Sequence, residues 1–182
     1  MEDISLDTCM DNYRTLVARV DRLCREIVVR YGSAVVCRQG CDTCCRHLSL
    51  FPVEAVSIRL ALDSLGQSEK TRIMDRAMAA SEDACPLLDQ GICLMYSHRP
   101  IICRTHGMPV LVDRDGERVV DFCPLNFKGI PLRDLDRQTI IDLETLNTAL
   151  AVINRMFASQ VLDKDSFPER LYLADALLME LD

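Results

Sequence analysis

The segment CRQGCDTCC, residues 37–45, places four cysteines within nine positions: Cys37, Cys41, Cys44 and Cys45. Dense cysteines indicate either disulfide bonds in an exported protein or metal ligation in a reducing compartment. We expect metal, because the N-terminal sequence MEDISLDTCMDNYR lacks the basic and then apolar stretches of a secretory signal. On the same grounds we predict a cytoplasmic protein. The disulfide alternative requires that the protein be exported.

Composition narrows the class of protein. The chain has 182 residues, of which 49% are hydrophobic and 27% charged, as is typical of one globular domain. A net charge of -7 without a basic stripe argues against nucleic acid as a partner. No apolar stretch approaches the ~20 residues that span a bilayer, so we expect no membrane association. We predict a single domain over residues 1–182, with a cysteine-cluster core at 33–127 and flanking helices at 1–32 and 131–182.

The N-terminal third of the chain predicts helices. Apolar residues recur at helical spacing over residues 4–31, and Gly32 follows as a stop, which indicates one long amphipathic helix. Residues 52–65 predict a second helix, with Pro52 in its first turn. A third helix is expected over residues 68–80, capped by Ser68.

The sequence pattern indicates hairpins in the cysteine-rich middle and helices again in the C-terminal part. The segments CPLLDQGIC and PVLVDRDGERVVDFC each place a turn signal between short apolar arms, which predicts two small hairpins. Helical spacing returns over residues 143–157, and Ser166–Glu169 resembles a capping box that opens a last helix ending at Leu181. The predicted fold class is mainly α: a small cysteine-rich metal-binding module with short β-hairpins, flanked and covered by amphipathic helices.

Eight cysteines lie outside the interiors of the predicted helices and are the candidate metal ligands. They are Cys37, Cys41, Cys44, Cys45, Cys85, Cys93, Cys103 and Cys123. Thiolates select zinc, Cu(I) or iron-sulfur centres over magnesium or calcium, so the expected cofactor is zinc or a [4Fe-4S] cluster. Eight ligands make two complete sets of four, but they divide into fours in many ways, and the sequence leaves the pairing open.

The adjacent pair Cys44 and Cys45 constrains that pairing. Neighbouring side chains tend to diverge, so both sulfurs reach one compact metal only if the backbone bends. We therefore assign them to different centres, which means either two sites or one cluster and one free reactive thiol. The C-x3-C-x2-C spacing also occurs in radical enzymes that bind S-adenosylmethionine. We reject that assignment because the chain lacks the repeated βαβ units of their barrel.

Other candidates have more ordinary explanations. Cys9 and Cys24 fall within the first predicted helix, where buried free thiols pack as small apolar groups. His106 follows Cys103 closely and is a candidate zinc ligand, although a surface histidine is the commoner outcome. Glu54 lies at the start of the second predicted helix, where a carboxylate complements the helix dipole.

Taken together, CRQGCDTCC, CPLLDQGICLMYSHRPIICRTHG and the later Cys123 resemble the YkgJ-like CxxxCxxCC cysteine-cluster family of zinc- or iron-chelating proteins. The resemblance covers residues 37–124. It implies a ligand role for the first seven candidate cysteines, with Cys123 as a looser match. Tyr96, Arg99, Pro100 and Arg104 also match family positions. Part of the flagellin lysine methylase is similar in its cysteine motif, which implies that some relatives act in protein modification.

Two functional hypotheses follow. In the first, the protein is a metal-binding protein whose thiolate-held zinc or iron-sulfur centre is structural or handles electrons, and the flanking helices bind a protein partner. In the second, it is a redox or protein-modifying enzyme that uses an iron-sulfur cluster, as in the flagellin lysine methylase. The sequence supplies ligands but no substrate pocket, which favours the first. Whether the protein is an enzyme stays open at this point.

Overall fold

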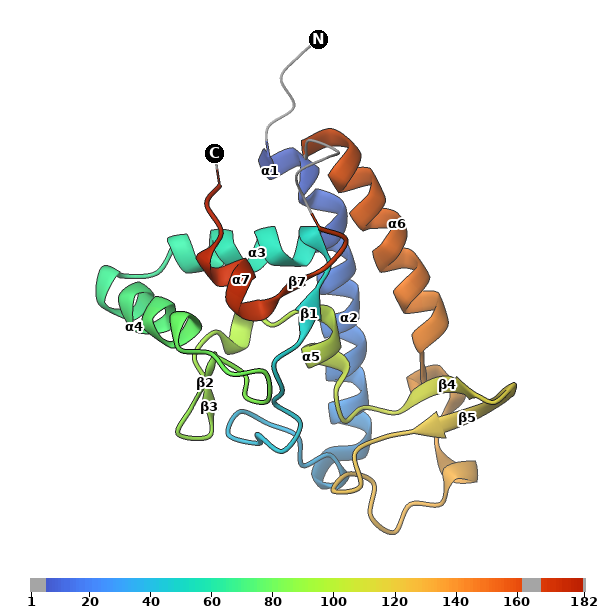
Figure 1. Cartoon of the computed structure of the whole chain (residues 1–182). Coiled ribbons are helices and arrows are strands. Elements are labelled where there is room, and N and C mark those ends of the chain that lie inside the picture. The colour runs from blue at the N-terminus through green and yellow to red at the C-terminus, as the bar shows by residue number, and fades with distance from the viewer. Residues whose placement is uncertain (1–5, 162–167, 182) are drawn as a thin grey trace.

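The computed structural model describes residues 6–161 and 168–181 (Figure 1). The predicted N-terminal helix forms as two pieces, α1 (Leu6–Cys9) and α2 (Asp11–Tyr31). The break falls at Met10, whose side chain is buried in the core at 1% exposure. Gly32 ends α2 as predicted, with a φ of 50° that a residue without a Cβ adopts at little cost.

The next two helices are α3 (Pro52–Asp63) and α4 (Gln67–Met78). Pro52 is the first helical residue of α3, which confirms its predicted position. The predicted cap of α4 was wrong. Gly66 is the N-cap, because its extended backbone precedes the helix and its carbonyl accepts the Lys70 N–H at 2.9 Å, so Ser68 lies inside the helix.

Both predicted hairpins are present. The first consists of β2 (Leu88–Asp89) and β3 (Ile92–Cys93), and the second of β4 (Val110–Arg114) and β5 (Glu117–Asp121). Their two-residue turns have positive φ at both positions, the type I′ geometry that matches the twist of paired strands. Strand β4 also pairs in parallel with β6 (Ile141–Asp142), which makes a three-stranded sheet that the sequence did not predict.

The remaining elements before the C-terminal segment are an unexpected short helix, the predicted helix α6 and several 3-10 turns. A 3-10 turn (Tyr96–His98) leads into the short helix α5 (Ile101–Thr105), which was not predicted. Helix α6 (Leu143–Val161) confirms the prediction for residues 143–157. Further 3-10 turns lie at Gly32–Ala34, Leu132–Asp134 and Arg137–Thr139.

The last helix begins later than predicted. Ser166 and Phe167 lie outside the described residues, and Pro168 and Glu169 are not helical. The next residues form β7 (Leu171–Tyr172), which pairs antiparallel with β1 (Ser49–Leu50). Helix α7 (Leu173–Leu178) follows. The residues expected in the first helical turns therefore form a strand that pairs with β1.

The core consists of two hydrophobic clusters that share α3. The first lies among α1, α2, α6 and the three-stranded sheet, and includes Val53 and Val56 of α3. The second lies among α3, α4, α7 and the β2–β3 hairpin, and includes Ile58 and Leu62 of α3. Helices α2 and α6 lie side by side in Figure 1, with α3, α4 and α7 grouped beside them. The fold is mainly α with short hairpins, as predicted.

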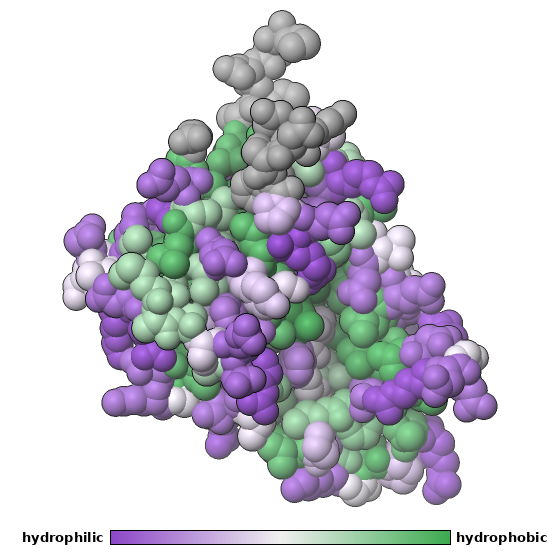
Figure 2. All heavy atoms as spheres, viewed as in Figure 1, coloured by the Kyte–Doolittle hydropathy of each residue, from purple (hydrophilic) through white to green (hydrophobic). Residues whose placement is uncertain are grey.

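The cysteine-rich loop leaves the end of α2 at the bottom of Figure 1. In the same view, polar residues spread over most of the surface, and hydrophobic residues form a patch at the bottom, where the loop after α2 and the segment after β5 lie (Figure 2). None of the helices in the described part of the chain combines the length and apolar character needed to cross a membrane.

Candidate metal centre

Residues 35–48, between α2 and β1, form an irregular loop that carries four of the candidate cysteines. Two successive turns shape it: the Cys41 N–H donates to the Arg38 carbonyl at 3.0 Å, and the Cys45 N–H donates to the Asp42 carbonyl at 2.9 Å. All eight candidate cysteines are half-buried free thiols. The loop therefore presents its sulfurs at the surface of the core without a helix or strand to fix them.

Four of the eight thiols are neighbours, and we call them set one. Set one is Cys37, Cys41, Cys44 and Cys123. Burial raises the pKa of Cys37 to about 11, and the charges of Cys123, Cys41 and Cys44 add to that rise. Burial also raises the pKa of Cys44, as do the charges of Cys41 and Cys123. These four thiols are therefore near enough for their charges to act on one another.

Gly107 provides a geometric link within set one. A Cβ on Gly107 would lie 2.4 Å from the Cys37 sulfur and 3.4 Å from the Cβ of Cys123, so both side chains contact the same glycine backbone. Gly107 also has a φ of 85°, which L-residues with side chains rarely adopt. The glycine in the segment CRTHG thus allows two cysteines that are distant in the chain to approach each other.

Asn126 holds the Cys37 sulfur in place. Its side chain is buried at 1% exposure, and its Nδ2 donates to the Cys37 sulfur at 3.1 Å and to the Gly107 carbonyl at 2.6 Å. Its Oδ1 accepts the backbone N–H groups of Val36 and Cys37 at 2.9 and 3.3 Å. The hydrogen bond to sulfur favours the thiolate, which is the form that binds metal.

The other four thiols are also neighbours, and we call them set two. Set two is Cys45, Cys85, Cys93 and Cys103. Burial raises the pKa of Cys103 to about 12, and the charges of Cys85, Cys93 and Cys45 add to it. Burial likewise raises the pKa of Cys45 to about 11, and Cys44, Cys85 and Cys93 contribute. Cys44 of set one and Cys45 of set two are consecutive in the chain.

The β2–β3 hairpin orders two members of set two. Cys93 pairs across the hairpin with Leu88, and Cys85 precedes the first strand by three residues. Burial raises the pKa of both thiols, but backbone N–H groups oppose it: those of Leu87 and Leu88 at Cys85, and that of Met95 at Cys93. Backbone donors to sulfur stabilise thiolates that bind metal.

Cys103 lies in helix α5, a helix that was not predicted, so the expectation that the eight cysteines lie in loops and hairpins was wrong for this residue. The helix is short and begins after Pro100, which occupies the N-cap position. The buried Glu54 accepts the Ile101 N–H at 3.0 Å with one oxygen and the Phe51 N–H at 3.3 Å with the other. Glu54 therefore serves the start of α3, as predicted, and also the start of the helix that carries Cys103.

Arg99 holds the backbone at Tyr96 and at Cys103. Its Nε donates to the Tyr96 carbonyl at 3.0 Å and its Nη1 to the Cys103 carbonyl at 3.1 Å, while its guanidinium lies 3.7 Å from the centre of the Tyr96 ring. Its positive charge lowers the pKa of Cys103 and Cys93 in set two and of Cys44 in set one, against the larger effect of burial. One cation thus acts on both sets.

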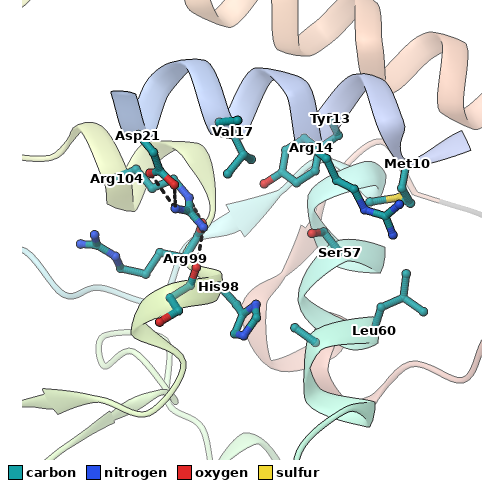
Figure 3. Close-up of a pocket in the computed structure, with 13 residues that line it drawn as sticks. Met10, Tyr13, Arg14, Val17, Asp21, Ser57, Leu60, His98, Arg99 and Arg104 are labelled. Carbon is teal, nitrogen blue, oxygen red and sulfur yellow. Dashed lines mark hydrogen bonds and ion pairs between the residues drawn. The ribbon is translucent and has the colours of Figure 1, made fainter. Parts of the chain in front are cut away.

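Arg104 ties α5 to α2. Its Nη1 lies 2.7 Å from both carboxylate oxygens of Asp21, and its Nη2 donates to the Ser97 carbonyl at 2.8 Å (Figure 3). The Arg104 side chain is only 9% exposed, so it is a buried structural residue. Arg38 and Arg46, which flank the cysteines of the loop, are exposed.

A groove lies beside the segment that carries Arg99 and Arg104. It measures about 460 Å³ and runs between α2, α3 and the residues from Ser97 to Arg104. Tyr13 and Val17 face it from α2, Leu60 from α3, and His98 from the opposite side (Figure 3).

The remaining cysteines and histidines do not join either set. Cys9 is buried in the first hydrophobic cluster, and the Cys24 thiol, whose pKa burial raises to about 11, donates to the Arg104 carbonyl at 3.5 Å. The Nδ1 of His47 lies 2.9 Å from the Ser81 carbonyl, and its Nε2 accepts the Ala174 N–H at 3.2 Å. His106, the candidate zinc ligand, is exposed.

Within the described residues, no three side chains of histidine, cysteine, aspartate or glutamate converge closely enough to hold one metal ion. The thiols of each set are therefore neighbours that have not closed around a common point. In set one, Cys37 is held by Asn126, whereas Cys41 and Cys44 lie on the irregular loop.

Residues 36–124 match the family model CxxCxxCC, described as a "Putative zinc- or iron-chelating domain". All eight candidate cysteines lie within the matched segment. This segment belongs to the CxxCxxCC cysteine-cluster family. In the CxxCxxCC domain of this chain, three residues separate Cys37 from Cys41, one more than the family label spells. Comparisons with curated proteins and with solved structures found no match.

The donors of the CxxCxxCC domain fit the metals in the family description. Thiolates are soft ligands that prefer zinc and iron-sulfur centres, and both accept four of them. Sequence reasoning missed Asn126, because the residue lies beyond the cysteine motif and a lone asparagine carries no signal of its own. It also missed Gly107, although that glycine stands within the motif-bearing segment CRTHG.

Proposed function

We propose that this protein holds zinc or an iron-sulfur cluster through its eight clustered thiols, and that the metal is structural or handles electrons. The observation that carries the proposal is that all eight thiols lie within the segment that matches a domain described as zinc- or iron-chelating. Bound there, zinc would supply a closed crosslink, and a cluster would supply one-electron chemistry.

A structural role is supported by where the ligands lie. The loop at residues 35–48 has no helix or strand, and the β2–β3 hairpin has two residues in each strand. Such segments bury too little apolar surface to be stable alone, and isolated hairpins are marginal in water. A metal that joins the loop, the hairpin, α5 and Cys123 would replace the missing core, and its binding free energy would stabilise the fold.

The test is elemental analysis and ultraviolet-visible absorbance of protein purified without oxygen. Zinc in a colourless protein supports a structural centre, whereas iron, sulfide and broad absorbance near ~400 nm indicate a cluster. Cys41→Ser is expected to lower both metal content and melting temperature. Cys24→Ser is the matched control and is expected to keep the metal, because Cys24 donates to a backbone carbonyl outside both sets. Unchanged metal content in Cys41→Ser would refute the proposal.

A second candidate function is a redox or protein-modifying enzyme, and the groove beside α5 favours it. The groove has the size of a ligand site and lies on the segment that carries Cys103. Its walls mix apolar side chains such as Leu60 with the polar Ser57 and His98. Loss of activity on a protein substrate in Ser57→Leu, with metal content unchanged, would support this function. A protein that contains only zinc in closed four-thiolate sites would argue against it.

A further inference from the structure

The groove between α2, α3 and residues 97–104 contains a buried hydroxyl group that has no internal partner. Tyr13 of α2 lines this groove and is 3% exposed, and its oxygen points from α2 into the groove (Figure 3). Its hydroxyl forms no hydrogen bond with any residue that the structure describes. Fully enclosed side-chain oxygens in that part of the chain all have partners, so the Tyr13 oxygen reaches the open space. Buried tyrosine hydroxyls usually have a partner, which leaves this one available to a ligand.

Two further polar side chains face the same space. Ser57 of α3 and His98 of the 3-10 turn line the groove, and neither side chain forms a hydrogen bond within the described ranges 6–161 and 168–181. The Ser57 hydroxyl donates or accepts a hydrogen bond, as do the ring nitrogens of His98. Val17 and Leu60 add an apolar wall beside them (Figure 3). A few polar groups on an apolar wall are typical of a site for a small organic molecule.

The Tyr13 hydroxyl requires a hydrogen-bond acceptor on the ligand. Burial raises the pKa of Tyr13 above the ordinary tyrosine value of about 10, so the phenol keeps its proton at neutral pH and acts as a donor. A carbonyl oxygen accepts such a hydrogen bond without carrying a charge. The groove volume of about 460 Å³ lies within the range of about 300–1,000 Å³ for sites of small organic ligands. The groove therefore has room for an apolar body attached to that carbonyl.

Ion pairs offset the charges at the two ends of the groove. At one end, the Nη1 of Arg104 lies 2.7 Å from both carboxylate oxygens of Asp21 (Figure 3). At the other end, the Nη2 of Arg14 lies 2.6 Å from the Oδ1 of Asp7, and its Nη1 lies 3.3 Å from the Oδ1 of Asp11. These pairs leave neither end with a strong attraction for an ion.

Arg99, the third arginine that lines the groove, is engaged elsewhere. Its guanidinium donates to the carbonyls of Tyr96 and Cys103 and lies 3.7 Å from the centre of the Tyr96 ring, outside the groove. A charged ligand would therefore lose its water without gaining an unpaired charge of opposite sign. The charge distribution thus favours an uncharged ligand.

We propose that this groove binds a small uncharged organic molecule with an apolar body and a carbonyl group that accepts a hydrogen bond from the Tyr13 hydroxyl. The apolar body lies against Val17 and Leu60, and Ser57 and His98 bind further polar atoms of the ligand. No thiol or metal takes part in this site, so the inference goes beyond the proposed metal-binding function and does not rest on it.

The experiment compares three probes of similar shape and different charge: benzamide, benzoate and benzylammonium. Each is titrated into the wild-type protein as purified, and binding is followed by saturation-transfer NMR of the probe. Benzamide is expected to bind with a dissociation constant on the order of 1 mM, as is usual for a fragment of its size. The two ions should bind about 5-fold more weakly or worse. Equal or tighter binding of either ion would overturn the uncharged ligand, and a lack of saturable benzamide binding would overturn the site.

The variant Tyr13→Phe tests the role of the hydroxyl. It is expected to weaken benzamide binding about 2- to 10-fold through the loss of one hydrogen bond. Its melting temperature should match that of the wild type, because the hydroxyl has no partner among the described residues. Tyr172→Phe is the matched control, since Tyr172 is 56% exposed on β7. Equal benzamide affinity in the two variants would overturn the role of Tyr13.

Metal content is measured on the same samples and separates this inference from the proposed function. A protein that contains metal but does not bind benzamide would refute the inference alone. A protein that binds benzamide in the expected way but takes up neither zinc nor iron would support the inference and refute the proposed function.

Discussion

The amide nitrogen of Asn126 lies 3.1 Å from the sulfur of Cys37 and donates a hydrogen bond to it. The same side chain accepts the backbone N–H of Cys37, so both the sulfur and the backbone of this ligand are fixed by one buried residue. Residues that orient metal ligands in this way commonly change metal affinity about 10- to 100-fold when replaced.

Asn126→Asp is therefore expected to weaken metal binding at set one. The carboxylate keeps the acceptor for the Val36 and Cys37 N–H groups but loses the donor to sulfur and places a negative charge beside a thiolate. We expect an affinity loss on the order of 10- to 100-fold at set one, with set two unaffected. Competition with a chelator, combined with thiol alkylation, measures each set. Asn154→Asp is the control, because Asn154 accepts the Val53 N–H far from the sulfurs; equal losses in both variants would contradict a specific role for Asn126.

Gly107→Ala is expected to destabilise the fold by more than the backbone strain that a positive φ imposes on alanine. Gly129 has a φ of 81° and open space where a Cβ would lie, so Gly129→Ala should cost only the backbone strain of about 1–2 kcal/mol. Gly107→Ala adds the clash with the Cys37 sulfur and should exceed that by about 1–3 kcal/mol. Denaturant unfolding of the two variants makes the comparison, and equal costs would mean that the approach of Cys37 to Gly107 is not required.

Arg99→Gln is expected to reduce metal retention at both sets, because the variant removes the charge that acts on Cys44, Cys93 and Cys103. It also removes the bonds that hold the backbone at Tyr96 and Cys103. Arg99→Lys keeps the charge without the planar fork and should be intermediate. The measurement is the rate of zinc transfer to a chromophoric chelator. The control is Arg118→Gln on the β4–β5 hairpin, because the exposed Arg118 side chain pairs with Asp142 of β6. A transfer rate for Arg99→Gln no faster than for this control would refute the role of Arg99.

Glu54 gives the fold a pH dependence of known sign. Burial raises the pKa of this carboxyl, while the N–H groups of Ile101 and Phe51 partly oppose the rise. A raised pKa in the folded state means that stability is fully present below the ordinary glutamate pKa of about 4.3 and is lost as pH rises through the folded-state value. The unfolding free energy of the wild type, measured relative to that of Glu54→Gln, should therefore fall as the pH rises from about 4.3 to the folded-state pKa of Glu54. A difference that does not change with pH would show that the N–H groups of Ile101 and Phe51 fully offset the effect of burial on the Glu54 pKa.

The sequence predicted those parts of the fold that depend on local patterns. Helical spacing located α2, α3 and α6, and the pairs Gln90-Gly91 and Asp115-Gly116 located both hairpins, since turn chemistry acts over a few residues. It failed where distant segments decide the outcome. Leu171 and Tyr172 pair with β1 instead of entering a helix, and β6 joins β4 across the sheet.

The candidate site shows the same difference between what local patterns predict and what contacts between distant segments decide. The motif identified the eight cysteines and the family, whereas the assignment of Cys44 and Cys45 to different centres stays a prediction. The membership of the two sets depends on how the loop, the hairpin and α5 come together, which no local spacing encodes. The role of Asn126 was hidden for the same reason, since it acts on Cys37 from a distant part of the chain.

Native mass spectrometry of the wild-type protein, purified without oxygen, tests the central claim most directly. The folded chain is expected to carry the mass of bound zinc or of an iron-sulfur cluster, and to lose that mass on denaturation. A folded chain with the mass of the polypeptide alone would contradict the account.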